Sequence, residues 1–477
     1  MSLDPNRVET GQNRGAGLDN DLAADYKYQL KRAAVDVKRL DDGTLIMRSP
    51  YAAPAPVAHP NVWLRKWAAE TPDEIIIAQP DSAAANGWDT LTYADGLAGA
   101  ETIAAKFAKW GLGAGNPVAT LAASGIDHAL IRLAAMRAGI PVVGLDPSIS
   151  EFAGAEYLAA AWELTKPGLL YVDDENLHGS ALKMAKDAGA RIVTPKTFPK
   201  LAKRGLFGGG FKGPDPDSNA IATINLAGAE TGAFDVAKIR GVAASYAQIC
   251  WEQEAVAAIA PHLASARPVL ADFRSWHRWD AGNLLFFAAL RSGGSICIEN
   301  ILTYGFAGAA PLPAPTVHFA DANTVYALLA HLELNTDIGA LFFRRLDGIW
   351  IYGGTLPEVA MDKLVAMAVQ SAGHKIPIFT GYHGDASPVA SMARWFDTDH
   401  SRNLGLPLPG TFARLKPEGE VPSGENGEVY ALHLMPPALG DEAADADDAG
   451  NYTDTGERVR LIDAMRPYLG IEPATEA

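Results

Sequence analysis

Short apolar segments alternate with longer segments of helical periodicity over most of this chain, and this alternation constrains its fold more than any other feature. Residues 117–122 read as a buried strand, residues 126–138 as a helix, and residues 140–145 as the next strand, which Asp146 and Pro147 close. Apolar strands separated by helices are typical of parallel sheets whose faces are covered by those helices. The sequence therefore predicts an α/β fold.

The alternation has two series, which predict two stacked α/β layers. Short segments at 169–172 and 191–193 continue the first series. The second series begins near residue 221 and has candidate strands at 269–273, 295–298, 316–319, 348–352 and 377–380. Helical periodicity is lost beyond Asn403, where Pro-Gly and Asn-Gly turns separate short strands and predict a small β-subdomain.

These patterns predict four consecutive regions. A short hairpin is expected around Asp42-Gly43, because residues 35–47 alternate apolar and polar side chains. The helix before Gly111 is expected to end there, as at a glycine C-cap. The expected regions are a flexible tail (1–34), a first α/β layer with the hairpin (35–220), a second α/β layer (221–390), and the β-subdomain with a C-terminal tail (391–477).

Composition excludes several classes of protein. The chain has 477 residues, of which 48% are hydrophobic, and a formal net charge of −16, which disfavours nucleic acid as a partner. Cys250 and Cys297 are the only cysteines, so neither a disulfide framework nor a cysteine-ligated zinc site is expected. The N-terminus lacks the order of a signal peptide, and no apolar run approaches the roughly 20 residues that span a bilayer. We expect a cytoplasmic protein with no membrane segment.

Residues 221–246 have the pattern of a phosphate-binding loop, in which a strand is followed by a Gly/Thr-rich turn and then by a helix. Gly228, Thr231 and Gly232 favour such a turn, since glycine adopts positive φ and a helix N-terminus attracts anions. Glu230 opposes an anion there, and the turn has few of the hydroxyl groups that phosphate loops use.

Four further segments resemble a known family. They are DDGTLIMRSPY (41–51), GIDHALIRLAAMRAGIPVVGLDPS (125–148), ADFRSWHRWDAGNLLFFAALRSGGSICIEN (271–300) and NLGLPLPG (403–410). Together they resemble the large N-terminal part of the adenylate-forming superfamily of acyl-CoA synthetases, and most of all the feruloyl-CoA synthases. The resemblance implies two layers that meet at a nucleotide site. In that family ATP and a carboxylate give an acyl-adenylate, from which the CoA thiol then displaces AMP.

The resemblance also implies a set of nucleotide-binding positions. The phosphate loop would use Gly228, Thr231, Gly232 and Lys238, although Ala227 and Ala229 stand where the family has hydroxyls. The positions implied for the nucleoside are Gly353, Gly354 and Thr355 along the adenine, Tyr382, and Glu457 at the ribose. The turn at 353–355 is equally open to interpretation as an ordinary strand-to-helix turn.

The metal position of the family is changed in this chain. The family glutamate that binds Mg²⁺ falls on Ala386, in Tyr382-His383-Gly384-Asp385-Ala386, and alanine coordinates no metal. Asp385 is an alternative ligand, but it is displaced by one residue, and Mg²⁺ requires near-octahedral geometry. We therefore predict no metal-binding residue.

The acyl-pocket positions implied by the resemblance are His128, Trp276, His277 and Arg278. Arg278 stands where the family has a histidine, and its guanidinium could bind a carboxylate or pair with Asp280. His128 is expected to line the pocket wall or to pack against it. The neighbouring aromatic residues could belong either to the pocket or to the core.

The family continues beyond residues like 459–463 into a hinge and a mobile domain of roughly 100 residues, a usual size for a small domain, which carries a catalytic lysine. The printed sequence stops at Ala477, so we expect no catalytic residue in this chain. The leading hypothesis is a degenerate homologue that binds a ligand (an aromatic acid or acyl-CoA) or a partner (another protein or a second copy).

Two other classes of function stay open. The chain is alternatively an aryl/acyl-CoA ligase whose lysine domain is supplied in trans, in which case ATP/AMP, Mg²⁺ and CoA are its cofactors. A hydrolytic or transfer chemistry through His128, His277 or His383 has less support, because the sequence contains neither a Gly-x-Ser-x-Gly nor a His-Glu-x-x-His motif.

Overall fold

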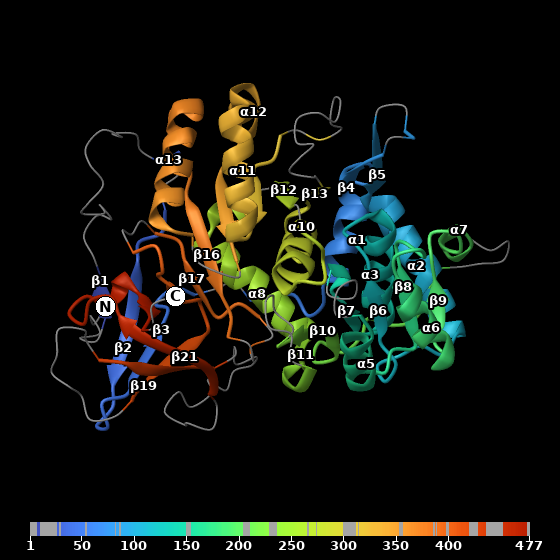
Figure 1. Cartoon of the computed structure of the whole chain (residues 1–477), viewed down its shortest axis with the longest axis horizontal. Coiled ribbons are helices and arrows are strands. Elements are labelled where there is room, and N and C mark those ends of the chain that lie inside the picture. The colour runs from blue at the N-terminus through green and yellow to red at the C-terminus, as the bar shows by residue number, and fades with distance from the viewer. Residues whose placement is uncertain are drawn as a thin grey trace.

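The fold was obtained as a computed structural model and contains three sheets with helices packed on them (Figure 1). The structure describes residues 7–9, 26–27, 30–52, 55–81, 83–84, 87–148, 154–203, 210–228, 236–264, 267–272, 274–298, 312, 314–352, 356–384, 387, 389–396, 400–418, 428–435 and 452–474.

The first sheet has six strands in the order β11-β10-β7-β6-β8-β9. Its strands are β6 (Val118–Leu121), β7 (Val142–Gly144), β8 (Leu169–Val172), β9 (Arg191–Val193), β10 (Ile221–Ala227) and β11 (Arg240–Ser245). All pairs are parallel except β10 with β11. The central strands β6 and β8 are buried along their whole length, as expected for a parallel sheet covered on both faces.

Helices that precede β6 or connect these strands provide the covering layers. They are α2 (Tyr93–Lys109), α3 (Ile126–Ala138), α5 (Gly154–Thr165), α6 (Gly179–Asp187) and α7 (Phe198–Ala202). Thr92 caps α2 by accepting a hydrogen bond from the Asp95 amide, and Gly111 follows the helix with φ of 72°. The predicted end of this helix at Gly111 is confirmed.

The second sheet has nine strands in the order β18-β17-β16-β15-β14-β12-β13-β4-β5. They are β4 (Ile75–Pro80), β5 (Trp88–Thr92), β12 (Val269–Asp272), β13 (Ser295–Ile298), β14 (Val317–Ala320), β15 (Gly348–Ile351), β16 (Ile378–Tyr382), β17 (Met392–Arg394) and β18 (Leu406–Pro407). The strands from β16 to β4 in this order are parallel, and the outer ones are antiparallel.

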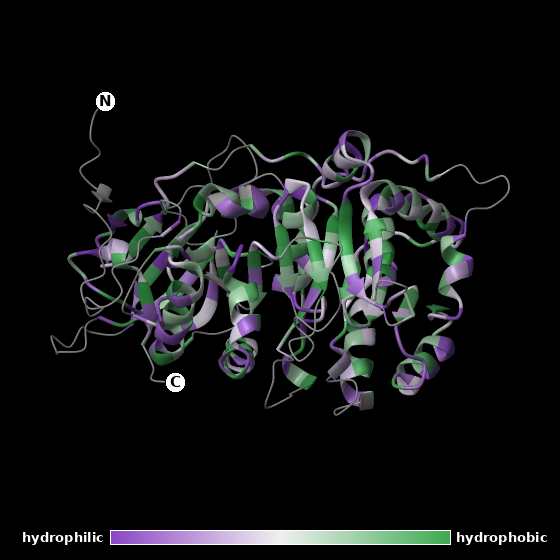
Figure 2. Cartoon of the chain, turned by 90° about the horizontal axis from the view of Figure 1, so that it is seen from above, coloured by the Kyte–Doolittle hydropathy of each residue, from purple (hydrophilic) through white to green (hydrophobic). Residues whose placement is uncertain are grey.

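The helices associated with this part of the chain are α1 (Asn61–Glu70), α8 (Tyr246–Ile259), α9 (Pro261–Ala264), α10 (Phe286–Ser292), α11 (Ala322–Leu334), α12 (Thr336–Phe343) and α13 (Glu358–Ala372). Figure 2 shows mostly apolar strands in the middle of the layers and polar colouring on the outer sides of the helices. The apolar core therefore lies between the sheets and their helices.

The third sheet is antiparallel, with seven strands in the order β1-β2-β3-β19-β20-β21-β22. They are β1 (Arg7–Glu9), β2 (Ala34–Arg39), β3 (Leu45–Arg48), β19 (Phe412–Pro417), β20 (Tyr430–Met435), β21 (Thr453–Leu461) and β22 (Ile471–Pro473). The predicted hairpin around Gly43 is confirmed as β2 and β3, and Gly43 has φ of 82°.

The predicted α/β class and the small β-subdomain are thus present, but the regions are not consecutive. Strands β4 and β5 precede the first layer's strands in sequence yet belong to the nine-stranded sheet, while β10 and β11 follow residue 221 yet belong to the six-stranded sheet. The hairpin at 34–48 joins the β-subdomain. Of the tail predicted at 1–34, residues 7–9 form a strand paired with β2. The prediction failed because strand pairing depends on contacts distant in sequence.

No helix in the described part of the chain is both long enough and apolar enough to cross a membrane.

Candidate functional site

A loop after β12, residues 274–280, spans the carboxyl ends of the two parallel sheets. The Ser124 hydroxyl, which follows β6, donates to the Arg274 carbonyl at 2.7 Å, and the Ser275 hydroxyl donates to the Ala122 carbonyl at 2.9 Å. Gly144, at the end of β7, lies so close that an added Cβ would be 2.7 Å from the Cα atom of His277. In sheets of this type, ligands bind outside the carboxyl ends of the strands. This junction is therefore the candidate site.

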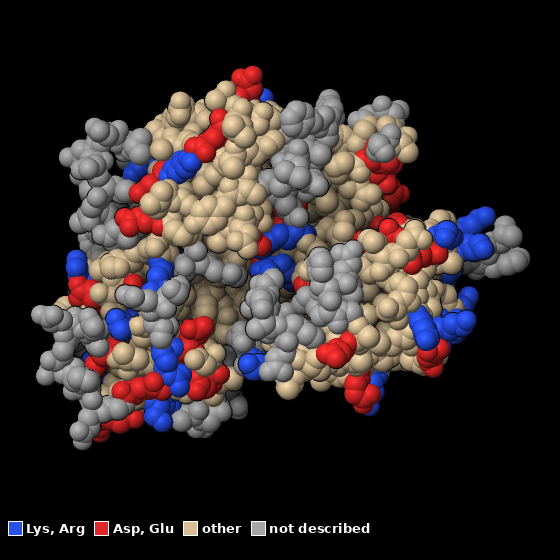
Figure 3. All heavy atoms as spheres, viewed as in Figure 1, with Lys and Arg blue, Asp and Glu red and all other residues tan. Residues whose placement is uncertain are grey.

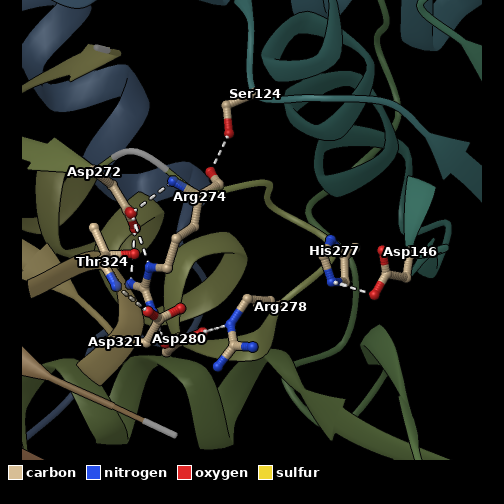
Figure 4. Close-up of polar contacts among 9 residues, drawn as sticks. All are labelled: Ser124, Asp146, Asp272, Arg274, His277, Arg278, Asp280, Asp321 and Thr324. Atoms are coloured by element: carbon tan, nitrogen blue, oxygen red, sulfur yellow. Dashed lines mark hydrogen bonds and ion pairs between the residues drawn. The ribbon is translucent and has the colours of Figure 1, made fainter. Parts of the chain in front are cut away.

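A buried ionic network holds the loop in place (Figure 4). Arg274 donates from Nε and Nη2 to the two carboxylate oxygens of Asp272, each at 2.9 Å, and from Nη1 to Asp280. All three side chains are at most 5% exposed. Asp321, which lies beside the network, caps α11 by accepting from the Thr324 amide at 2.8 Å. Buried charges of this kind are stable when they are paired.

Arg278 is the arginine of this region whose guanidinium reaches the surface of the site. Burial alone would raise the pKa of Asp280, but the charges of Arg274 and Arg278 outweigh it and lower the pKa to about 2. Arg278 Nε lies 3.4 Å from Asp280, so the pairing predicted between these residues is present. The Arg278 side chain is 35% exposed, and its Nη atoms point away from Asp280 in Figure 4. Figure 3 shows Lys and Arg side chains gathered near the middle of this face.

The loop leads into a π-helix, η2 (Asp280–Leu285), that connects both sheets. Buried Arg132 of α3 donates to the Gly282 carbonyl and, at 3.2 Å, to the Asn283 side chain. The Asn283 amide in turn donates to Thr223 of β10 at 3.0 Å. A Cβ at Gly282 would lie 2.2 Å from the Trp276 carbonyl oxygen, so glycine is required for this packing. π-Helical turns are frequent at functional sites.

His277 connects the loop to the segment that follows β7. Its Nε2 atom lies 3.2 Å from Asp146. Burial opposes ionisation of Asp146, but hydrogen bonds from His277 and Ser148 outweigh burial and lower its pKa. The predicted residue His277 is therefore at the junction of the two sheets.

Two other predicted pocket residues are in the core. His128 and Trp276 are 2% and 1% exposed, and their ring centroids are 5.3 Å apart. Burial lowers the pKa of His128 to about 3, so this imidazole is neutral at physiological pH, with Nδ1 2.9 Å from the Ala123 carbonyl. Of the two roles left open for His128, its burial favours packing.

The predicted phosphate loop has a different local structure. Strand β10 is followed by the antiparallel strand β11, and the helix α8 begins only at Tyr246. Ser245, which caps α8, is paired with Ile221, at the opposite end of the hairpin from Gly228. The predicted succession of strand, turn and helix is wrong, because β11 and a short 3-10 helix, η1 (Val236–Lys238), come between β10 and α8.

The hairpin nevertheless brings two predicted residues together. Gly228 has φ of 80°, and an added Cβ would lie 2.2 Å from the Lys238 carbonyl oxygen, so only glycine fits there. Thr231 and Gly232 lie outside the described residues, as do Gly353, Gly354 and Thr355.

The remaining nucleotide positions come from two different sheets. Tyr382 is the last residue of β16, and exposed Glu457 lies on β21. A Cβ at Gly384 would lie 2.9 Å from the Cβ atom of Thr455, whose hydroxyl accepts a hydrogen bond from the Glu457 amide at 3.1 Å. The turn containing Glu457 thus packs against the segment that follows β16.

Sequence reasoning missed the anchoring residues. Arg274 and Asp272 are close in sequence, and an Asp-x-Arg pattern at the end of a predicted strand was an available signal. Glu252 was also missed. It is fully buried on α8, and burial raises its pKa to about 8. Its Oε1 atom accepts a hydrogen bond from the Ala390 amide at 2.6 Å.

The described residues contain no group of three or more His, Cys, Asp or Glu side chains arranged to hold a metal ion. Ala386 and Asp385, the positions discussed for Mg²⁺, are outside that part of the chain.

Comparisons with known proteins agree with the fold. Residues 64–228 match the sequence model of the AMP-binding enzyme family. ATP-bound MatB from Rhodopseudomonas palustris superposes with a TM-score of 0.64 and 16% identity, over 87% of this chain and 78% of that one. The chain matches none of the curated protein sequences compared with it.

Two further solved structures are similar. O-succinylbenzoate coenzyme A synthetase from Bacillus subtilis has a TM-score of 0.62 and 16% identity, over 86% of this chain and 78% of that chain. A putative long-chain-fatty-acid CoA ligase from R. palustris has a TM-score of 0.66 and 15% identity, over 88% and 99%. At this level of identity the structures establish the fold.

Proposed function

We propose that this protein, which has the acyl-CoA synthetase fold of the AMP-binding, adenylate-forming superfamily, binds a carboxylate-bearing ligand at the carboxyl ends of its two parallel sheets and does not form an acyl-adenylate by itself. The ligand class is an aromatic acid or its CoA ester. The observation that carries the proposal is the position of Arg278.

Arg278 is the cation of the ionic network best placed to meet a ligand. Arg274 uses Nε, Nη1 and Nη2 on Asp272 and Asp280, so it is fully engaged. Arg278 approaches Asp280 through Nε, and within the described residues its Nη atoms make no hydrogen bond. A partly exposed guanidinium with two available donors suits bidentate binding of a carboxylate.

An aromatic ligand is supported by the rings beside Arg278. The Trp279 and His383 rings lie 4.6 Å apart, and Trp279 also contacts Tyr352 at 5.6 Å. Trp279 and Tyr352 are buried, so His383 is the partly exposed ring of this group on which a planar ligand ring would pack while its carboxylate meets the guanidinium. One similar structure is named for O-succinylbenzoate, an aromatic acid, and the sequence resembles the feruloyl-CoA synthases most.

The lack of adenylation rests on residue identities. Phosphoryl chemistry requires a preorganised cation and donors around the phosphates. Alanine occupies position 386, where the resemblance implies the Mg²⁺ ligand, and positions 227 and 229, where it implies hydroxyls. Each loss of a preorganised charge or donor costs about 100- to 1,000-fold in rate.

Calorimetric titration with ferulate, feruloyl-CoA, AMP and ATP tests the proposal. We expect R278M to weaken ferulate binding by at least about 10-fold, because a hydrogen bond to a charged group contributes about 1.5–3 kcal/mol. The matched control is R267M. Arg267 is also a partly exposed, ion-paired arginine, but it precedes β12 and so lies at the amino-terminal end of that strand, away from the site. Equal ferulate affinity in R278M and wild type would refute this role of Arg278. Robust pyrophosphate release from ATP and ferulate by the purified chain would refute the absence of adenylation.

A second candidate is a ligase completed in trans by another protein that supplies the lysine. It is favoured by the packing of Thr455 against Gly384, which holds the turn of Glu457 beside the end of β16, as a ribose-binding acid would require. Co-purification followed by an ATP-dependent thioester assay tests it. If no small molecule binds, a protein partner or a second copy is the remaining type of ligand.

A further inference from the structure

Helix α8 lies near the centre of the molecule (Figure 1) and packs against α9, α10, β11 and the π-helix η2. It follows the β10–β11 hairpin directly, and its buried residues cover all sides of the helix. Gln253 donates to the Leu284 carbonyl of the π-helix at 3.3 Å, and Glu254 forms a bidentate pair with Arg291 of α10 at 2.7 and 2.9 Å. A movement of α8 would therefore change the packing of the π-helix and of α10.

Glu252 joins this helix to the segment after β16. Its Oε1 atom accepts from the Ala390 amide at 2.6 Å, whereas its Oε2 atom is buried and makes no hydrogen bond within the described residues. Tyr352, whose buried hydroxyl likewise makes none there, is close enough to be affected by a charge on Glu252. Tyr352 immediately precedes residues 353–355, and Ala390 closely follows residues 385–386. Glu252 thus accepts a hydrogen bond from Ala390 and acts electrostatically on Tyr352, and these two residues flank segments implied in nucleotide binding.

We propose that Glu252 is a positioning residue for the ligand site: when protonated it holds residues 389–391 against α8 beside Tyr352, and loss of its proton favours release of that segment. This inference rests on the proposed function for its effect on ligands, but its effect on the segment itself does not depend on any ligand.

The chemistry of a buried carboxyl gives the direction of the effect. Burial raises the pKa of Glu252 from 4.5 to about 8. When the segment opens, the carboxyl meets water and regains an ordinary pKa. Between pH 4.5 and pH 8 the closed form holds a proton that the open form loses, so opening becomes more favourable as pH rises through that range.

The groups facing Glu252 support this behaviour. The Ala390 amide is its one hydrogen-bond donor among the described residues; this bond lowers the pKa of Glu252, but burial outweighs it, and no cation is placed against the carboxyl there. Tyr352 faces it from the end of β15, and the charges of Arg274 and Asp280 act on Tyr352 in opposite directions. Glu254 points elsewhere, to Arg291. Glu252 is therefore the group whose charge is left uncompensated.

Hydrogen exchange of the free protein tests the inference directly. Exchange protection of the amides at 389–391, corrected for intrinsic rates, should fall on the order of 100-fold between pH 5.5 and 8.5 in wild type. In E252Q, which keeps the shape and the acceptor but cannot ionise, it should change by less than about 3-fold. E254Q is the matched control on the same helix and should keep the wild-type pH dependence.

Ligand binding provides the second measurement. Affinity for AMP and for ferulate should fall over the same pH range in wild type and stay level in E252Q. If neither probe binds, the proposed function fails, and hydrogen exchange still decides the role of Glu252. The inference is overturned if E252Q keeps the wild-type pH dependence at 389–391, or if the amides at 389–391 and those of β8 have the same free energy of opening at each pH, which would indicate that both exchange through global unfolding.

Discussion

Replacing Arg274 by methionine should destabilise the protein strongly, although Arg274 itself touches no proposed ligand. The change removes the cation that two buried carboxylates share, Asp272 through two hydrogen bonds and Asp280 through one. Methionine has a similar volume, so the perturbation is mainly one of charge.

The magnitude follows from burial. Asp272 and Asp280 are at most 5% exposed, and removing one partner of a buried pair leaves an uncompensated charge at a cost of about 3–5 kcal/mol. The lowered pKa of Asp280, about 2 against an ordinary 3.8, has the same direction, because the charges of Arg274 and Arg278 stabilise its ionised form.

Urea unfolding at pH 7, followed by tryptophan fluorescence, measures this cost from the shift in midpoint and the shared m-value. The matched control is R278M, in which the lost pair is 35% exposed and 3.4 Å long, so a cost below about 1 kcal/mol is expected. R274M should therefore have a much lower free energy of unfolding than wild type, and R278M should have nearly the wild-type value. Ligand binding, in contrast, should be weakened in R278M.

The pH dependence gives a stricter test. In wild type, the lowered pKa of Asp280 means that its contribution is present above pH 3.8 and is lost as pH falls toward 2. In R274M burial dominates, so the carboxyls favour protonation and the deficit relative to wild type should be smaller at pH 4.5 than at pH 7. A cost of less than 1 kcal/mol for R274M, or a deficit that grows on acidification, would refute the reasoning.

Three further predictions concern stability and local structure. In urea unfolding, E252Q should be more stable than wild type by up to about 3 kcal/mol at pH 7 and equally stable near pH 4.5. The reason is that the raised pKa of Glu252 makes the wild type lose stability as pH rises toward 8. Parallel plots of unfolding free energy against pH for the two proteins would contradict this. G144A should lower the free energy of unfolding by about 1–3 kcal/mol, because the added methyl group would press on the His277 backbone; thermal unfolding measures this loss. G179A, where an added Cβ meets nothing within 4 Å, is the control and should be neutral. R132M should cost about 1–3 kcal/mol and speed hydrogen exchange in the π-helix, since the carbonyl of Gly282 loses its buried donor; unchanged exchange there would count against that role.

The parts of the fold that could be predicted from the sequence are those decided by local pattern. The helix at 126–138 and the strands at 169–172 and 191–193 have the predicted bounds, since period and flanking breakers specify them. The pairing of Arg278 with Asp280 was also predictable, because one residue separates them and opposite charges so close in sequence are readily brought together.

The parts that could not be predicted depend on distant contacts. β11 contains no pattern that distinguishes it from the first turn of a helix, and it is a strand because it pairs along the whole of β10. No role was predicted for Glu252, because its hydrogen-bond partner, Ala390, lies 138 residues away. Propensity is a weak guide where tertiary pairing decides the outcome.

The interleaving of the sheets has a consequence for how the protein reaches its fold. One edge of the nine-stranded sheet is formed by β4 and β5, which are synthesised before any strand of the six-stranded sheet. The six-stranded sheet is complete only after β10 and β11 have been synthesised. On the ribosome, β4 and β5 must therefore remain without their sheet partner until residues 295–298 have been synthesised. Pairings so distant in sequence are slow to form, and exposed apolar strands tend to aggregate in the meantime. Neither parallel sheet can be isolated by cutting the chain once, so a fragment ending near residue 220 would contain two incomplete sheets.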